Sequence, residues 1–113
     1  MAFVVVKSID KNSILRAVEK LVDQWRKNVE DVVKVIWFGS WTTGDPTPGS
    51  DVDICVILAQ SNKSFRDRIL DFLPIGFPVG IDIFPYTVSE FKELQKNHPS
   101  MYREITKGKV LME

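Results

Sequence analysis

Cysteine and histidine are nearly absent from the sequence, which holds one of each, Cys55 and His98. A single cysteine excludes an internal disulfide and is typical of a reducing compartment, so we expect a cytoplasmic protein. Two such residues also offer no spacing for a site built from Cys and His metal ligands. Disulfide frameworks and zinc motifs of that kind are therefore excluded.

An excess of charge of one sign is also missing, because 15 Lys and Arg residues balance 15 Asp and Glu residues. No basic run indicates nucleic acid as a partner, so strong nucleic-acid binding is not expected. No apolar run approaches the roughly 20 residues that span a bilayer. The opening "MAFVVV" is too short for the core of a signal peptide. We therefore expect no membrane attachment.

What the sequence does contain suits one domain, 1–113, with a modest hydrophobic core. Apolar residues at helical spacing alternate with β-branched and aromatic runs, which predicts an α/β or α+β fold. The expected helices are 11–27 with Asp10 as N-cap, 63–73, 87–97 with a Thr87–Glu90 capping box, and a short one from Pro99 to a stop at Gly108. The expected strands are 32–38, 52–58, 79–85 and an edge strand at 109–112.

The strand expected at 52–58 carries two carboxylates at its start, Asp51 and Asp53. Side chains alternate along a strand, so both point to one face, with their roots roughly 7 Å apart. Unpaired, they repel each other, and burying either one without a partner is unfavourable. A hard divalent ion such as Mg²⁺ accepts carboxylate oxygens and resolves this conflict. The pair therefore predicts a metal site.

A third carboxylate, Asp82, lies in the apolar strand expected at 79–85. Charged residues are rarely buried unless they are paired. If this strand lies beside 52–58, Asp82 joins Asp51 and Asp53 in one cluster. Three carboxylates with two Mg²⁺ ions suit phosphoryl transfer, because the metals can bind the attacking and leaving oxygens. A salt bridge to a nearby Lys or Arg is the plainer alternative for Asp82.

The loop before these carboxylates offers donors for phosphate. Gly39 and Ser40 follow the strand 32–38 and are expected to open a short helix over 41–44. Glycine lets the backbone approach a phosphate closely, and the helix N-terminus and the Ser40 hydroxyl can donate hydrogen bonds to its oxygens. Ser50, at the far end of the loop, can cap or bind a triphosphate. These three residues are the expected nucleotide-binding residues, although a tight turn alone would also explain Gly39 and Ser40.

The segment 39–53 resembles the Gly-Ser-x10-Asp-x-Asp signature of the polymerase-β-like nucleotidyltransferases. With Asp82 downstream and so short a chain, the sequence is similar to the minimal nucleotidyltransferase (MNT) family. The resemblance runs from the first helix to about Tyr86, and the short helical end is similar too. It implies a mixed sheet with flanking helices that binds Mg²⁺ and an NTP, with ATP expected over other NTPs.

The resemblance also implies roles for residues and partners. Asp51, Asp53 and Asp82 would be the metal ligands and catalytic residues, and Asp82 would also help deprotonate an attacking hydroxyl. Gly39 and Ser40 would hold the terminal phosphates. Many MNT proteins pair, as antitoxins, with a small helical HEPN-type protein, and some transfer AMP to a tyrosine of that partner. The resemblance therefore implies AMP transfer to a HEPN-type partner.

Two alternatives stay open. One is a nucleotide-binding antitoxin that neutralises its partner by occlusion without chemistry, and the other is a subunit of a small-molecule adenylyltransferase. The family often reads Gly-Ser-x-Ala-Arg-Gly where this chain has Thr43 at the arginine position, which removes charge-assisted bonds to phosphate. A partner or a second copy is expected to complete the cleft, with the loop 41–48 as the candidate contact. Lys63, Arg66 and Arg68 are interpreted as a solvated helix face.

Overall fold

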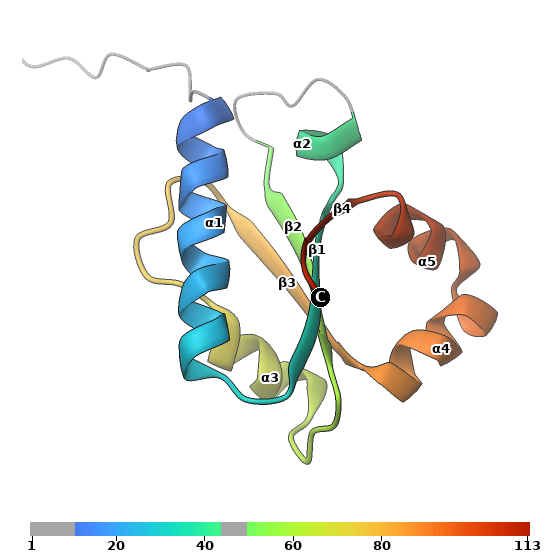
Figure 1. Ribbon diagram of the computed structural model, residues 1–113. Helices are drawn as coiled ribbons and strands as arrows, with labels where there is room; N and C mark the ends of the chain where they lie inside the picture. Colours follow the sequence, from blue (N-terminus) through green and yellow to red (C-terminus); the bar gives the residue numbers. More distant parts are fainter. Residues whose placement is uncertain (1–10, 44–49) are drawn as a thin grey trace, which may run out of the picture.

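The described residues of the computed structural model, 11–43 and 50–113, form a four-stranded sheet with helices on both faces (Figure 1). The strand order is β3-β2-β1-β4. The elements are α1 (Lys11–Asn28), β1 (Val32–Phe38), α2 (Ser40–Thr43), β2 (Val52–Leu58), α3 (Phe65–Phe72), β3 (Ile81–Thr87), α4 (Val88–Asn97), α5 (Pro99–Thr106) and β4 (Lys109–Met112).

The directions of the strands decide which residues meet at each end of the sheet. β1 runs antiparallel to both β2 and β4, whereas β2 and β3 are parallel. The crossover between these two parallel strands contains α3. Parallel strands start at the same end of a sheet, so the first residues of β2 and β3 lie side by side. The predicted α/β class with a mixed sheet is confirmed, and so is the edge strand at 109–112.

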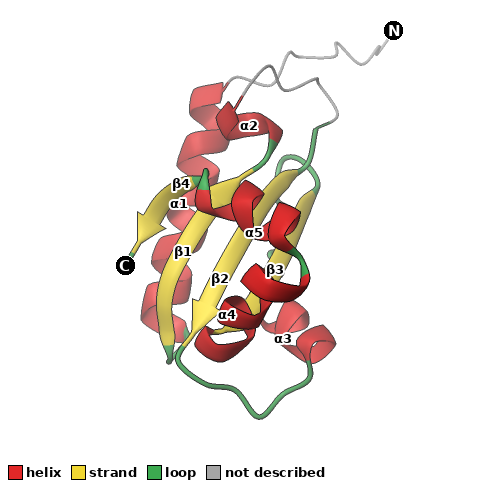
Figure 2. Ribbon diagram, turned by 90° about the vertical axis from the view of Figure 1, so that its right-hand side faces the viewer, coloured by secondary structure: helices red, strands yellow, loops and turns green. Residues whose placement is uncertain are grey.

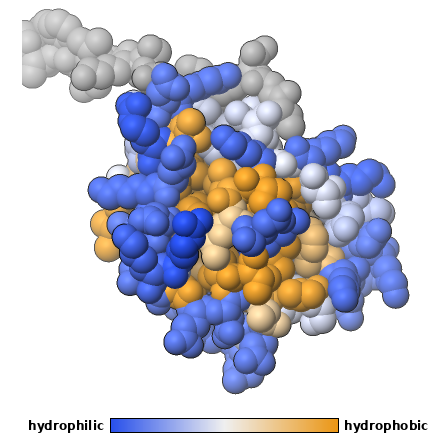
Figure 3. Space-filling view, in the orientation of Figure 1, coloured by the Kyte–Doolittle hydropathy of each residue, from blue (hydrophilic) through white to orange (hydrophobic). Residues whose placement is uncertain are grey.

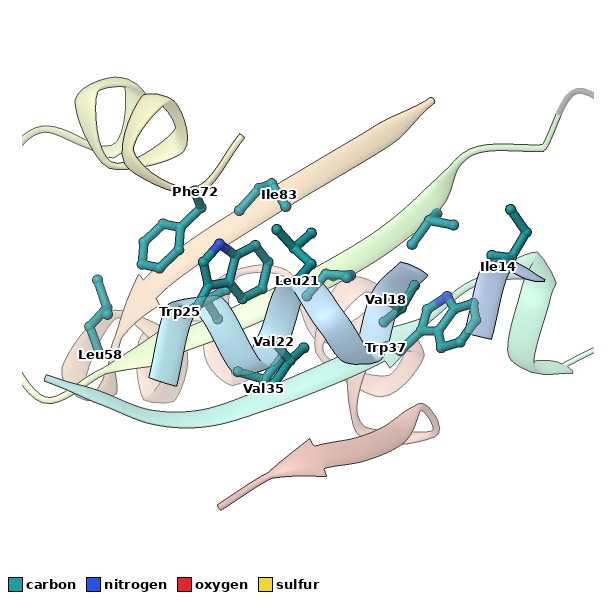
Figure 4. Packing of buried hydrophobic residues seen from close by; sticks show 13 residues of the cluster. Ile14, Val18, Leu21, Val22, Trp25, Val35, Trp37, Leu58, Phe72 and Ile83 are labelled. Carbon is teal, nitrogen blue, oxygen red and sulfur yellow. The ribbon is translucent and has the colours of Figure 1, made fainter. Parts of the chain in front are cut away.

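One face of the sheet is covered by α1, whose apolar residues recur at helical spacing and form a single buried stripe (Figure 4). The stripe packs against β1 and β2 residues such as Val35 and Ile54. Trp25 meets Phe72 of α3 edge to face, with ring centroids 5.2 Å apart, which is a favoured aromatic geometry. The buried residues of α1 are Ile14, Val18, Leu21, Val22 and Trp25.

The opposite face is covered by α4 and α5 (Figure 2). α4 packs over β3 and β2, and α5 packs over β1. Beneath these helices lie the buried Cys55 and Ile57 of β2 and the half-buried Phe84 and Tyr86 of β3. The apolar cover therefore belongs to the later residues of β2 and β3, and the first residues of both strands precede it.

β3 is displaced by two residues from the predicted range 79–85. Pro85 does not end the strand, because β3 lies at the edge of the sheet, where a missing N–H is tolerated on the side away from the neighbouring strand. The carbonyl of Pro85 accepts a hydrogen bond from Arg68 at 2.9 Å. The strand therefore continues to Thr87, which also caps α4.

The helix caps follow the sequence closely. The predicted capping box is present, because the Thr87 hydroxyl accepts from the Glu90 N–H at 3.2 Å and the Glu90 carboxylate accepts from the Thr87 N–H at 2.9 Å. Ser64 caps α3, so this helix starts two residues later than predicted, at Phe65. The predicted N-cap of α1, Asp10, lies outside the described residues.

Arg68 shows that the interpretation of Lys63, Arg66 and Arg68 as a solvated face was wrong for one of its members. The Arg68 side chain is only 7% exposed and makes a bidentate ion pair with Glu90, at 2.6 and 3.1 Å. The helical period places position 68 on the same side as the buried Phe72, and a buried guanidinium requires such partners. The ion pair joins α3 to the start of α4.

Apolar surface remains at the β4 edge of the sheet. Figure 3 shows hydrophobic side chains gathered in the middle of this view, where Figure 1 places β4. Val110 of β4 is 44% exposed and Val33 of β1 is 42% exposed. Among the described residues, no helix has the length and apolarity needed to cross a bilayer.

Candidate active site

Asp53 and Asp82 lie directly opposite each other on the parallel strands β2 and β3. Neighbouring strands are about 4.8 Å apart, and residues in register point to the same face, so the two carboxylates are neighbours. Asp53 is half-buried and Asp82 is exposed. The expectation that β3 lies beside β2 and brings Asp82 to Asp53 is confirmed.

Asp51 precedes β2 and shares the face of Asp53, because side chains alternate along the strand. The residue between them, Val52, is fully buried in the α1-side core. Asp51 itself is exposed, and its negative charge acts on Asp53. All three predicted carboxylates therefore lie at one end of the sheet and couple electrostatically at Asp53.

The electrostatics of this end are unfavourable for the charged carboxylate. Burial of Asp53, together with the negative charges of Asp82 and Asp51, raises the pKa of the Asp53 carboxyl to about 6. Within residues 11–43 and 50–113, no Lys, Arg or His forms an ion pair with any of the three aspartates. A bound cation would relieve this repulsion, because opposite charge favours the ionised form of a carboxyl.

Gly39 gives Asp53 the space that its carboxylate occupies. A Cβ added at Gly39 would overlap the Asp53 carboxylate, with the carboxyl carbon only 3.3 Å away. The backbone also has φ +89° here, a conformation that residues with side chains rarely adopt. Two independent reasons therefore require glycine between β1 and α2, and the overlap with Asp53 places the turn against the acidic end of the sheet.

The turn after Gly39 is held by hydrogen bonds within the chain. The Thr42 N–H and hydroxyl both donate to the Gly39 carbonyl, at 3.1 and 3.0 Å. Ser40 begins α2 and is exposed, next to the glycine that meets Asp53. The helix predicted at 41–44 is therefore present one residue earlier, over Ser40–Thr43, and Gly44 lies outside the described residues.

Trp41 joins the two ends of the loop. Its indole N–H donates to the carbonyl of Ser50 at 3.0 Å, and its half-buried ring packs against the α1-side core. This bond fixes the backbone immediately before Asp51, so Trp41 has a structural role in placing the start of β2. Most of the predicted contact loop, residues 44–48, lies outside the described residues.

The donor set fits a hard divalent cation in its chemistry, because it consists of carboxylates that repel each other. In the described part of the chain, however, no three Asp, Glu, His or Cys side chains are already gathered closely enough to hold an ion by themselves. Further oxygen ligands are needed to complete a coordination shell. Mg²⁺ is commonly held by one or two carboxylates together with phosphate oxygens of a substrate.

The family of the chain follows from a comparison with models of known protein families. The family model of the nucleotidyltransferase domain matches residues 18–111, which include all three aspartates and the Gly39–Ser40 turn. The chain belongs to the nucleotidyltransferase domain family. The resemblance drawn from the segment 39–53 is thereby confirmed at the level of this family.

Solved structures support the same fold for this nucleotidyltransferase domain. A protein from Sulfolobus solfataricus assigned as a nucleotidyltransferase is 21% identical, with a TM-score of 0.59 over 74% of this chain and 75% of that chain. A mutant of the toxin–antitoxin MntA-HpeT is 18% identical, with a TM-score of 0.54 over 91% of this chain and 73% of that chain. At these identities the likeness shows the fold alone. No curated protein matches the chain.

Gly80 is a residue near the site that the sequence interpretation missed. A Cβ added at Gly80 would overlap the carboxylate of Asp51, with the carboxyl carbon 2.9 Å away. The available signal is a glycine two residues before Asp82, in "VGID", inside the strand expected at 79–85. The structure therefore places a glycine against two of the three aspartates, Gly39 at Asp53 and Gly80 at Asp51.

Proposed function

We propose that this nucleotidyltransferase domain transfers AMP from ATP to a hydroxyl group of a small helical partner protein of the HEPN type. One observation carries the proposal. Asp53 and Asp82 lie in register on parallel strands, with Asp51 on the same face and the Gly39–Ser40 turn against Asp53. In a chain of this family, that arrangement supports the proposal that acidic metal ligands and a phosphate-binding turn lie at the same place.

The proposed reaction is an attack on the α-phosphorus. The acceptor oxygen forms a bond to this phosphorus, the bond to the bridging oxygen of pyrophosphate breaks, and the hydroxyl proton leaves to a base. Asp82 is the proposed base, since it is exposed beside Asp53 at the start of β3. Gly39, Ser40 and Ser50 are proposed to hold the phosphates. Such transfers depend mainly on positioning and charge stabilisation.

Asp51, Asp53 and Asp82 are proposed to hold Mg²⁺, with two ions in the full assembly. Mg²⁺ would neutralise charge on the triphosphate when it is bound. The repulsion that raises the pKa of Asp53 supports this assignment, because a cation removes the cause of the shift. Phosphate oxygens of ATP are proposed to complete the ligand shell that the described residues leave incomplete.

The partner is proposed from the resemblance and from one solved structure. The toxin–antitoxin MntA-HpeT shares this fold, and its mutant carries two Asp-to-Glu changes separated by one residue. That spacing equals the spacing of Asp51 and Asp53. An antitoxin role for this chain, in the cytoplasm and with a HEPN-type toxin as acceptor, is consistent with both observations.

Occlusion without chemistry is the second candidate, and Thr43 is the observation that favours it. The family often has an arginine at this position, and the threonine cannot make bidentate bonds to phosphate. Under this alternative the chain binds nucleotide and covers its partner, and no bond to the partner forms. The same carboxylates would then serve nucleotide binding only.

The two candidates are separated by the fate of labelled ATP. The chain, Mg²⁺ and the candidate partner are incubated with ATP labelled either on the α-phosphate or on the γ-phosphate. AMP transfer predicts that only the α-label reaches the partner, whose mass increases by one AMP group. The γ-label serves as the control against phosphate transfer, and replacing ATP by GTP, CTP or UTP tests the preference for the base.

The outcome is read on the same samples. Absence of α-label on a partner that still binds the chain tightly would leave occlusion as the function. Incorporation of γ-label would contradict nucleotidyl transfer. Transfer to a small molecule in place of the partner, seen as label that runs with low-molecular-weight products, would support the adenylyltransferase alternative.

A further inference from the structure

Gly80 and Asp51 face each other across the start of β2 and β3. The Val52 N–H donates to the Gly80 carbonyl at 2.9 Å, so the backbones of the two strands are fixed to each other at this level. The Asp51 carboxylate occupies the space where a side chain at position 80 would begin. The backbone does not require glycine at this position, because the φ of Gly80 lies outside the left-handed region that favours this residue. The space taken by the Asp51 carboxylate is therefore the explanation for this glycine.

We propose that Gly80 is a positioning residue that lets the Asp51 carboxylate lie over β3, on the side of Asp82. The inference rests on the proposed function in treating Asp51 as a metal ligand. It adds that the place of this ligand is set from the neighbouring strand, by a residue without a side chain. Gly80 has for Asp51 the role that Gly39 has for Asp53, but without the strained backbone of Gly39.

Gly80→Ala is a selective way to move one carboxylate. The backbone at Gly80 accepts alanine, and its carbonyl keeps the hydrogen bond to Val52. Asp51 is exposed, so its carboxylate can rotate into solvent when the methyl group is added. Thermal stability of the apo chain should therefore be retained, or should rise, since alanine restricts the unfolded chain more than glycine does.

The test is a double-mutant cycle on metal affinity. Mn²⁺ binding is measured by calorimetry and by electron paramagnetic resonance, in the presence of a non-hydrolysable ATP analogue. The four proteins are wild type, Gly80→Ala, Asp51→Asn and the double variant, each with its melting temperature. Groups that orient metal ligands typically contribute about 10-fold to 100-fold to affinity, so we expect Gly80→Ala to weaken Mn²⁺ binding by about that factor. In the Asp51→Asn background, Gly80→Ala should have no further effect.

The result that overturns the inference is Mn²⁺ affinity in Gly80→Ala equal to that of wild type, or a full additional loss in the Asp51→Asn background. A loss of affinity that follows a loss of melting temperature would also overturn it, because the glycine would then serve folding. Failure of the proposed function looks different: the cycle behaves as expected while wild-type protein transfers no AMP to any partner. If wild type binds no Mn²⁺, both the inference and the metal assignment fall.

Discussion

Carboxyl groups at the two ends of β3 have pKa values shifted in opposite directions. At its start, Asp82 lies beside Asp53, and like charges together with burial raise the pKa of Asp53 to about 6. Just beyond its end, Glu90 accepts two bonds from the buried Arg68, and these bonds lower the pKa of Glu90 to about 2. The same strand therefore has a cluster of mutually repelling carboxylates at its start and a hydrogen-bonded ion pair just beyond its end.

We interpret the acids at the start of β3 as serving function and the ion pair of Glu90 as serving stability. A folded chain that needed only stability would pair the acids at the start of β3, as it pairs Glu90 at the end. Repulsion that persists in the native state supports our proposal that these carboxylates bind a cation from outside the chain, since perturbed pKa values gather at functional sites. Structural ion pairs also shift pKa values, but the shift of Glu90 favours its charged form and that of Asp53 opposes it.

The largest effect is expected from neutralising the acidic end. The double substitution Asp51→Asn with Asp53→Asn should lower the rate of AMP transfer by about 1,000-fold or more, because metal ions supply several kcal/mol of transition-state stabilisation. The measurement is α-label on the partner at saturating Mg²⁺, with far-ultraviolet circular dichroism to verify the fold. Transfer at the wild-type rate would remove both residues from the proposed roles. The matched control is Asp67→Asn on α3, which should transfer normally.

The next largest effect is expected from breaking the ion pair just beyond the end of β3. Arg68→Ala should lower the free energy of unfolding by about 2 kcal/mol, because it removes the ion pair to Glu90 and the donor to the Pro85 carbonyl. The effect stays below that of a fully buried pair, since the Glu90 side chain is 42% exposed. The measurement is urea unfolding at pH 7. Arg66→Ala, on the exposed side of the same helix, should change the value by less than about 0.5 kcal/mol.

The dependence of this stability difference on acidic pH sharpens the prediction. The pKa of Glu90 is lowered in the native state, so its stabilising contribution is complete above the ordinary value of about 4.5 and is lost as pH falls toward about 2. The difference between wild type and Arg68→Ala should therefore shrink below about pH 4.5. A difference that stays constant down to about pH 2 would show that the Arg68–Glu90 charge interaction contributes nothing.

Gly39→Ala should have a somewhat smaller effect on stability. The positive φ and the overlap with Asp53 should together lower the free energy of unfolding by about 1 to 2 kcal/mol. Part of this loss should disappear in the Asp53→Ala background, where the overlapping carboxylate is absent. Equal losses in both backgrounds would assign the requirement for glycine to the backbone alone. Urea unfolding of the four variants measures both contributions.

The smallest effect has the opposite sign. Asp53 binds its proton more tightly in the native state than in the unfolded chain, so ionisation destabilises the apo protein as pH rises from about 4 through about 6. Asp53→Asn should therefore stabilise the apo chain by about 1 kcal/mol at pH 8, a figure reduced for solvent screening. The gain should vanish below about pH 4. Thermal unfolding across this range, with Glu104→Gln as an exposed control, measures it; a loss of stability at pH 8 would contradict the account.

Much of the fold could be predicted from the sequence because its signals are local. The helical spacing of α1, the Thr87–Glu90 capping box and the β-branched runs of β1 and β2 all appear at the predicted places. The spacing of Asp51 and Asp53 also predicted a shared face, since alternation is a property of any strand. For the site, the sequence predicted that Asp82 would join Asp53 if the two strands are neighbours, and the structure places β3 beside β2 with these residues in register.

What could not be predicted depends on contacts between distant segments. Burial of Arg68 requires α3 to lie against the end of β3, and its charge alone favours a solvated position. Pro85 reads as a strand end until the strand is known to lie at the sheet edge. The closeness of Gly80 to Asp51 depends on the register of two strands, which no local pattern encodes.

The most direct test of the account measures how nucleotide and metal stabilise the chain. Thermal unfolding at pH 8 is recorded with and without Mg²⁺ and a non-hydrolysable ATP analogue, for wild type, the Asp51→Asn/Asp53→Asn variant and Arg68→Ala. Ligand at about 100 times its Kd should stabilise wild type by about 2.7 kcal/mol. Arg68→Ala should gain the same amount from a lower starting stability, and the double variant should gain nothing. An equal gain in the double variant, or none in wild type, would contradict the assignment of the acidic end of β3 as the nucleotide and metal site.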